Sequence, residues 1–215
     1  LMHTSIGTAL AVIVFTSISS LYAHHRHGAI LWRNFVKLTP TILLGSYSGA
    51  ILAKYLSFDF LRVFFALFEI CVALIMWFGI SASGHADKLS RWVWSFAGYV
   101  IGLISAMVGI GGGTMTTPFL VYNNIQIKNA IATSAAVGMP IAIAGSIGFM
   151  VAGSSQVLQT GGIGFVNFEA LITIAVSSVF FAPLGAKVTH LIDSNKLKKG
   201  FSIFLAFLAA MVILF

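Results

Sequence analysis

The residues best suited to chemistry lie in one short stretch, Gly109–Pro118, which reads GIGGGTMTTP. Four glycines within five residues weaken a helix by about 1 kcal/mol each relative to alanine, so the stretch predicts a break in an apolar helix. A second helix that starts after the break would offer unpaired backbone N–H groups and the positive pole of its dipole. We expect Pro118 in the first turn of that helix, and we expect the helix start to bind an anion.

The donors expected at this break are backbone N–H groups and hydroxyls of neighbouring residues: Gly111, Gly112, Gly113, Thr114, Thr116 and Thr117. Hydroxyls from elsewhere in the chain are expected to line the same cavity: Thr133, Ser134 and, in the other half, Thr8. No lysine or arginine lies deep in an apolar run near the break, so donors and dipoles would have to replace a counter-charge. The alternative interpretation is that the glycines only let two helices cross closely.

The composition indicates which class of protein surrounds this break. Of the 215 residues, 59% are hydrophobic and only 8% are charged, and the mean hydropathy is +1.00. A water-soluble domain of this size could not bury so much apolar surface, so the sequence predicts an all-α, polytopic integral membrane protein. The net charge of +7 comes largely from short loops between apolar runs, which favours a lipid bilayer as surroundings and no nucleic acid as partner.

Apolar runs of helical length follow one another along the chain, at about residues 4–22, 34–56, 60–80, 92 to the glycine break, 130–151, 165–188 and 200–215. A short apolar piece that ends at Tyr122 follows the break, and Pro140 predicts a kink in the run that contains it. We therefore expect about seven transmembrane helices in a multi-pass protein of the inner cell membrane.

Two groups of ionisable residues invite a functional interpretation. Glu69 lies at the centre of an apolar run, where a carboxylate is costly, so it is a candidate for proton coupling. The alternative is a carboxyl group hydrogen-bonded to neighbouring helices. The histidines of the string AHHRHG, residues 23–28, could share a metal ion, but no cysteine or carboxylate accompanies them, and a positively charged loop beside a membrane explains them. We expect no metal and no cofactor.

An internal repeat is visible in the sequence. Residues 6–12, IGTALAV, match residues 131–137, IATSAAV, at four of seven positions, and Gly49–Ala50 falls on Gly185–Ala186. The offset between the two copies grows by eleven residues between these matches. Such duplications are found in transporters whose binding sites lie between related halves.

The repeat predicts two halves, residues 1–84 and 85–215, with a boundary in the polar loop Ser81–Arg91. In the second half the GIGGG run precedes IATSAAV, so we expect the first half to have its own glycine-broken span before Leu1. Each half would then hold four spans, eight in all for the full-length protein. Because four is an even number, both halves are expected to face the same way.

Basic residues orient membrane proteins, because loops rich in lysine and arginine stay in the cytoplasm. If every span crosses the membrane once, seven basic residues share one side: Lys54, Arg62, Lys128, Lys187, Lys196, Lys198 and Lys199. Five lie on the other side: Arg26, Arg33, Lys37, Lys88 and Arg91. This count favours the first set as cytoplasmic, and a re-entrant glycine segment would overturn it.

The stretch Gly102–Leu120, GLISAMVGIGGGTMTTPFL, followed by Ala130–Ala136, AIATSAA, resembles the TauE/SafE family of sulfite exporters, also described as toluene-sulfonate uptake permeases. A weaker first-half counterpart lies at Ser5–Val12, and the resemblance covers essentially the whole chain. It implies a bacterial-type membrane transporter of small sulfur-containing or carboxylated anions, such as sulfite, sulfonates or sulfoacetate. Relative to the family pattern, the first glycine-rich span is missing.

Two other classes of function are alternatives to a transporter. An enzyme is not expected, because no lysine follows the glycine stretch as in a phosphate-binding loop, and no HExxH string occurs. A structural or assembly subunit of a membrane complex remains the alternative, although such a subunit would not need costly glycines at membrane depth. The sequence leaves the oligomeric state, the anion and the direction of transport open.

Overall fold

The computed structural model describes residues 2–78, 90–154 and 161–214. The helices are α1 (Met2–Arg26), α2 (Trp32–Ala53), α3 (Phe58–Phe78), α4 (Arg91–Val108), α5 (Gly113–Tyr122), α6 (Ile127–Ala152), α7 (Phe168–Leu191) and α8 (Ser194–Leu214). Two short antiparallel strands, β1 (Gly162–Ile163) and β2 (Val166–Asn167), join α6 to α7. The expected boundary between halves, after residue 84, lies outside the described residues, and so does part of the loop before β1.

The helices confirm the expected all-α, polytopic architecture. Six of them, α1 to α4, α6 and α7, are long and apolar enough to cross a membrane. The last expected span corresponds to α8, whose apolar part Ser202–Leu214 is shorter. The predicted helix break is present, because α4 ends at Val108 and α5 begins at Gly113. Pro118 differs from expectation: it is the sixth residue of α5 and not part of its first turn, because the glycines start the helix earlier.

Helices α1 and α6 lie antiparallel at the centre of the bundle. Near the start of α1, a Cβ added at Gly7 would touch the side chain of Phe149, which lies near the end of α6. At the other end of the bundle, Ala29 and Ile30 of the α1–α2 loop pack against Ala132 near the start of α6. We name these two ends the strand end, where β1 and β2 lie, and the histidine end, where the loop with His27 lies.

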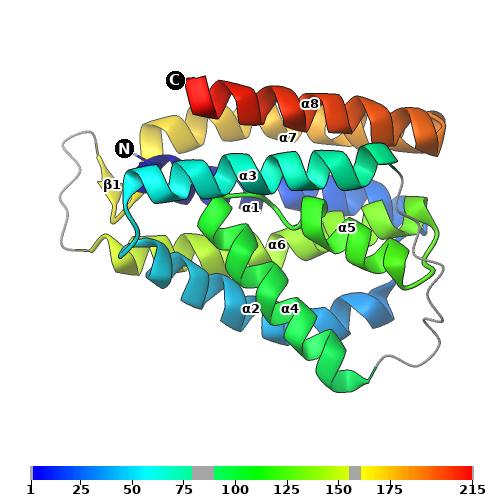
Figure 1. The fold of residues 1–215 in the computed structure, drawn as a ribbon, viewed down its shortest axis with the longest axis horizontal. Coiled ribbons are helices and arrows are strands. Elements are labelled where there is room, and N and C mark those ends of the chain that lie inside the picture. The colour runs from blue at the N-terminus through cyan, green and yellow to red at the C-terminus, as the bar shows by residue number, and fades with distance from the viewer. Residues whose placement is uncertain (1, 79–89, 155–160, 215) are drawn as a thin grey trace.

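The helices α4 and α5 form a re-entrant hairpin that begins and finishes at the histidine end (Figure 1). Near the start of α4, Trp94 packs edge-to-face on Phe119 of α5, with ring centroids 5.1 Å apart. The turn of the hairpin reaches deep towards the strand end, where a Cβ at Gly109 would lie 3.1 Å from Ile6. From there α5 runs back, and Thr117 reaches Ser134 near the start of α6. The hairpin therefore does not cross the bundle.

Because the hairpin turns back, the two halves are oriented differently relative to each other than the sequence predicts. With α4–α5 returning to its own side, each half has three crossing helices, an odd number, so the halves are inverted relative to each other. The antiparallel packing of α1 on α6 shows the same inversion directly. The expectation that both halves face the same way was wrong, because the length and hydropathy of α4 match those of a crossing helix.

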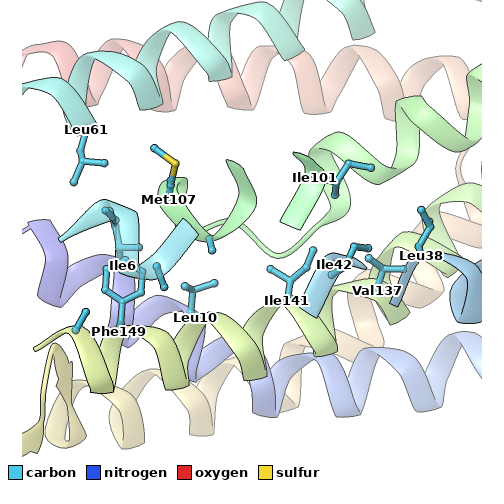
Figure 2. Packing of buried hydrophobic residues seen from close by; sticks show 14 of the residues in the cluster. Ile6, Leu10, Leu38, Ile42, Leu61, Ile101, Met107, Val137, Ile141 and Phe149 are labelled. Carbon is cyan, nitrogen blue, oxygen red and sulfur yellow. The ribbon is translucent and has the colours of Figure 1, made fainter. Parts of the chain in front are cut away.

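The core lies where α1, α2, α4 and α6 meet (Figure 2). Its fully buried side chains include Leu10 of α1, Ile42 of α2 and Ile141 of α6. The crossing of α2 and α4 is close because glycines face backbone on both sides. A Cβ at Gly45 would collide with the Tyr99 carbonyl group, and one at Gly102 would collide with the Ile42 carbonyl group. This packing holds the hairpin against α2.

Candidate functional site

The end of α4 at the helix break is closed to ligands by its own backbone. Gly109 adopts a left-handed conformation with φ of 79°, which turns the chain out of the helix. The N–H groups of Gly109 and Ile110 both donate to the Ser105 carbonyl oxygen, at 2.9 and 3.0 Å. This is the hydrogen-bonding that satisfies the last carbonyls of a helix. The negative pole of α4 is thereby partly occupied.

The start of α5, in contrast, is open. Its N-cap Gly112 has φ of 43° and forms no side-chain cap. The N–H groups of Gly112 and Gly113 are used within the break, because they donate to the carbonyls of Ile110 and Gly111. Among the described residues, the N–H groups of Thr114 and Met115 find no acceptor. The backbone donors offered to a ligand therefore lie one or two residues beyond the glycines that the sequence suggested.

Two threonine hydroxyls accompany these N–H groups in the first turns of α5. Thr114 is 5% exposed and Thr116 is fully buried, and neither hydroxyl has a hydrogen-bond partner within the described part of the chain. An unpartnered buried hydroxyl costs about 1–3 kcal/mol, so two of them beside one open helix start call for an explanation. A bound polar ligand would provide the missing partner.

Thr117 and Ser134 are also brought together at this site, but they pair with each other. Their hydroxyl oxygens lie 2.8 Å apart. Ser134 donates its own hydrogen to the Ile131 carbonyl oxygen at 2.9 Å, so Thr117 is the donor in the pair. This bond ties the second turn of α5 to α6, and it holds the open helix start in place.

The walls of the break come from the middle of α1 and α6. Cβ atoms added at Gly111 and Gly112 would lie 3.0 Å from Ile13 and 2.7 Å from Ile141, so only glycine fits here without displacement (Figure 2 shows Ile141). Pro140 lies inside α6 and has no N–H, which leaves a carbonyl one turn earlier without its helical partner. The break thus faces a locally weakened part of the neighbouring helix.

The structure does not bring Thr8 and Thr133 into this group, because both hydroxyls hold loops. Thr8 accepts a hydrogen bond from the N–H of Asn167, just before α7, at 3.0 Å. Thr133 accepts one from the N–H of Leu31, just before α2, at 2.9 Å. The two bonds are equivalent. In one, a threonine of α1 accepts from the residue that precedes α7, and in the other, a threonine of α6 accepts from the residue that precedes α2.

Glu69, the expected coupling residue, lies in α3 and not at the break. It is 1% exposed, and its Oε2 atom has no hydrogen-bond partner among the described residues. The next turn of α3 carries Val72 and Ala73, which pack against Leu205 of α8. A buried carboxyl group is therefore present in α3, and it is not among the donors at the start of α5.

Sequence reasoning missed two further hydroxyls, those of Ser46 in α2 and Ser105 in α4. Both are buried, and neither has a partner in the described part of the chain. Ser105 lies in the last turn of α4, next to the break. Only their burial without partners distinguishes these two hydroxyls from the other serines of the helices. Within the described ranges, no group of three metal-binding side chains gathers.

The comparisons with known proteins agree with this picture of a membrane transporter. The chain is 34% identical over 211 residues to a "Probable membrane transporter protein" of Haemophilus influenzae, covering 97% of this chain and 80% of that relative. It is 28% identical to the "Probable membrane transporter protein YdhB" of Bacillus subtilis, covering 93% of this chain and 80% of that protein. A similarly named protein of Methanocaldococcus jannaschii is 27% identical, and the match covers 90% of this chain and 73% of that protein.

No solved structure gives a significant match. The relatives' names and the apolar helices indicate a multi-pass membrane transporter rather than an enzyme. A sequence model for "Sulfite exporter TauE/SafE" matches residues 1–212, nearly the whole chain. The chain therefore belongs to the TauE/SafE family of membrane transporters.

Proposed function

We propose that this protein carries a small sulfur-containing oxyanion, such as sulfite or a sulfonate, across the inner cell membrane. The observation that carries the proposal is the open start of α5, with the unpartnered hydroxyls of Thr114 and Thr116 beside it. These groups are all hydrogen-bond donors towards an anion, and the helix dipole adds a partial positive charge. The family name supports sulfite as the first anion to test.

The same arrangement explains how an anion is held at membrane depth without a lysine or arginine. Transporters with broken helices direct half-helix N-termini at anionic groups near the bilayer midplane. Here the N–H groups of Gly109 and Ile110 occupy one carbonyl at the end of α4, whereas the donors at the start of α5 are open, so we expect the start of α5 to attract an anion. Tetrahedral and pyramidal oxyanions offer several acceptor oxygens, which suits backbone and hydroxyl donors that converge from one helix turn.

The sharpest test compares Thr116→Val with Thr133→Val in the purified chain, with sulfite-dependent thermal stability as the measurement. A ligand at 100 times its Kd stabilises a protein by about 2.7 kcal/mol, so sulfite should raise the unfolding temperature of the unmodified chain. Thr116→Val removes a hydroxyl that has no partner. We expect it to leave the anion-free stability unchanged or higher, and to weaken sulfite binding about tenfold or more.

Thr133→Val is the matched control, because its hydroxyl accepts the Leu31 N–H. We expect that variant to lose about 1–3 kcal/mol of stability and to keep the full sulfite response. A full sulfite response in Thr116→Val would contradict the site. The absence of any response to sulfite, sulfonates or other oxyanions in the unmodified chain would favour the alternative of an assembly subunit.

We further propose that transport is coupled to protons through Glu69. A carboxyl group that is 1% exposed among apolar helices gains or loses a proton at high cost unless its surroundings change. Replacing Glu69 with glutamine is expected to leave anion flux measurable and to remove its dependence on an imposed pH gradient. Glu169→Gln is the control, since Glu169 is exposed in the first turn of α7. An unchanged pH dependence in Glu69→Gln would remove this coupling role.

A further inference from the structure

An apolar groove of about 380 Å³ lies between α1 and α7, and none of its lining residues belongs to the helix break. All of the lining side chains are apolar, and they include Phe15 of α1 with Ile172, Val176 and Phe180 of α7. Phe15 is 48% exposed and Val176 is 58% exposed. A groove with such walls on two membrane-length helices suits a hydrocarbon chain, because it offers a charged or polar ligand no hydrogen bond.

The groove lies on a face that is also open in the half covered by the α4–α5 hairpin. Helices α2 and α7 begin at residues 32 and 168, and α3 and α8 begin at residues 58 and 194, an offset of 136 in both cases. By this offset Ile172 and Phe180 correspond to Val36 and Leu44 of α2. The two residues of α7 are 63% and 76% exposed, and those of α2 are 64% and 67% exposed. The hairpin therefore leaves this face to the lipid bilayer.

Helices α1 and α7 lie side by side and run in the same direction. Thr8 of α1 accepts a hydrogen bond from the N–H of Asn167, at the start of α7. Further along, the Ser19 hydroxyl donates to the Val179 carbonyl oxygen at 3.0 Å. The two pairs are separated by 159 and 160 positions in the sequence, so the register between the helices stays constant. This register shows which residues of α1 and α7 share a depth in the membrane.

Two basic residues lie at the histidine end of the groove. By the register, Arg26 at the end of α1 is level with Ala186, next to Lys187 of α7. Each lies on a helix stripe that lines the groove, because Arg26 follows Phe15 by eleven residues and Lys187 follows Val176 by eleven, about three turns. Both basic side chains are exposed, and in the described part of the chain neither has an ion-pair partner.

The spacing between these charges and the groove matches one leaflet of a bilayer. Eleven residues of an α-helix rise about 16 Å, and half of a hydrocarbon core is about 15 Å thick. Tyr22 lies one turn before Arg26 on the same stripe and is 63% exposed, which suits the level where tyrosines meet lipid headgroups. A lipid with its phosphate at Arg26 and Lys187 therefore reaches the groove with an acyl chain.

We propose that this groove binds an anionic phospholipid, with the phosphate held by Arg26 and Lys187 and one acyl chain between α1 and α7. Basic pockets between transmembrane helices bind anionic headgroups in this way. A second copy of the chain fits the charges less well. In a two-fold dimer on this face both copies have the same orientation in the membrane, so Arg26 and Lys187 would lie near their own copies and repel them.

Photo-crosslinking of the purified chain in vesicles tests this proposal. Benzoylphenylalanine is placed at position 180 in the groove or, as the matched control, at position 207 of α8. Both positions carry phenylalanine and are exposed, at 76% and 60%, but Phe207 does not line the groove. The vesicles consist mostly of phosphatidylcholine with a minor share of phosphatidylglycerol. Mass spectrometry then identifies the lipid that is attached at each position.

We expect phosphatidylglycerol to exceed its share of the vesicle lipid about fivefold or more among the adducts at position 180, because one basic residue contributes about fivefold in affinity for an anionic lipid. The adducts at position 207 should match the composition of the vesicles. Adducts at position 180 that match this composition would overturn the proposal. So would a crosslink from position 180 to a second copy of the chain in place of lipid.

Two charge variants test the role of the basic pair. Arg26→Gln combined with Lys187→Gln should remove the enrichment at position 180. Arg33→Gln combined with Arg91→Gln removes two exposed basic residues of the same end from α2 and α4, and should keep it. Enrichment that survives the first pair of substitutions, or that is lost equally in the second, would overturn the proposal. No sulfite is present, so failure of the lipid site leaves the proposed anion site untouched, and the reverse also holds.

Discussion

Replacing Gly112 with alanine is expected to reduce anion flux at least tenfold while the protein remains in the membrane at close to normal abundance. Gly112 has φ of 43°, a conformation that costs residues with a Cβ about 1–2 kcal/mol. Its new Cβ would also lie 2.7 Å from Cδ1 of Ile141, which must move. Both effects displace the start of α5, where the proposed donors are. Radiolabelled sulfite uptake into vesicles, normalised to protein abundance, measures the result.

The neighbouring Gly113 provides the matched control. Gly113 is the first residue of α5, its φ is not positive, and an added Cβ would meet no atom within 4 Å. Alanine is also the better helix former by about 1 kcal/mol. We therefore expect Gly113→Ala to retain flux and to be at least as stable as the unmodified chain. Equal losses in both variants would show that the site is not organised by the conformation of Gly112.

A double variant separates the two causes. Ile141→Val removes the methyl group that the new Cβ of Gly112→Ala would touch, and leaves the positive φ of position 112 in place. If the backbone conformation dominates, the double variant stays impaired. If the steric contact dominates, flux recovers, and the shape of the cavity matters more than the geometry of the helix start. Preserved flux in Gly112→Ala itself would contradict the site.

The helices and the break could be predicted because each depends on the residues of one short stretch of the chain. Runs of about twenty apolar residues mark membrane helices, and the expected run 34–56 became α2 at Trp32–Ala53. Glycines weaken a helix wherever they cluster, so the end of α4 and the start of α5 were visible in GIGGG. Pro118 was misplaced because α5 begins at Gly113, within the glycine stretch, which puts the proline beyond the first turn.

The role of each hydroxyl could not be predicted, because it depends on partners far away in the chain. Thr8 and Thr116 look alike in sequence, since each lies among small and apolar residues. In the structure, Thr8 binds the N–H of a residue 159 positions later, whereas Thr116 is buried without a partner. Only the assembled helices distinguish a hydroxyl that holds a loop from one that is available to a ligand.

The direction of the hairpin also depends on tertiary packing. Helix α4 has 18 residues and enough hydropathy to cross a membrane, so its sequence is compatible with crossing and with turning back. In the structure, Gly102 packs against α2 and Gly109 packs against α1, and α5 then runs back in contact with α6. This packing changes the distribution of charge between the two ends of the bundle, and hence the expected orientation.

With the re-entrant hairpin in place, the basic residues of the described helices and loops gather at one end. The histidine end carries Arg26, Arg33, Lys37, Arg91, Lys128, Lys187, Lys196 and Lys199, and the strand end carries Lys54 and Arg62. Relative to the sequence-based count, four lysines now share an end with Arg33: Lys128, Lys187, Lys196 and Lys199. Eight against two is a strong bias, and loops rich in lysine and arginine stay in the cytoplasm. We infer that the histidine end is cytoplasmic.

Single cysteines are therefore expected to react from opposite sides of the membrane. In a Cys71→Ser background, which removes the only native cysteine, Lys54→Cys should react with a membrane-impermeant maleimide in intact cells. Arg33→Cys and Lys128→Cys should react only in inside-out vesicles. The position of Lys128 is decisive: if α4 and α5 together crossed the membrane, Lys128→Cys would react on the same side as Lys54→Cys. Its reaction together with Arg33→Cys establishes both the re-entrant hairpin and the inversion of the two halves.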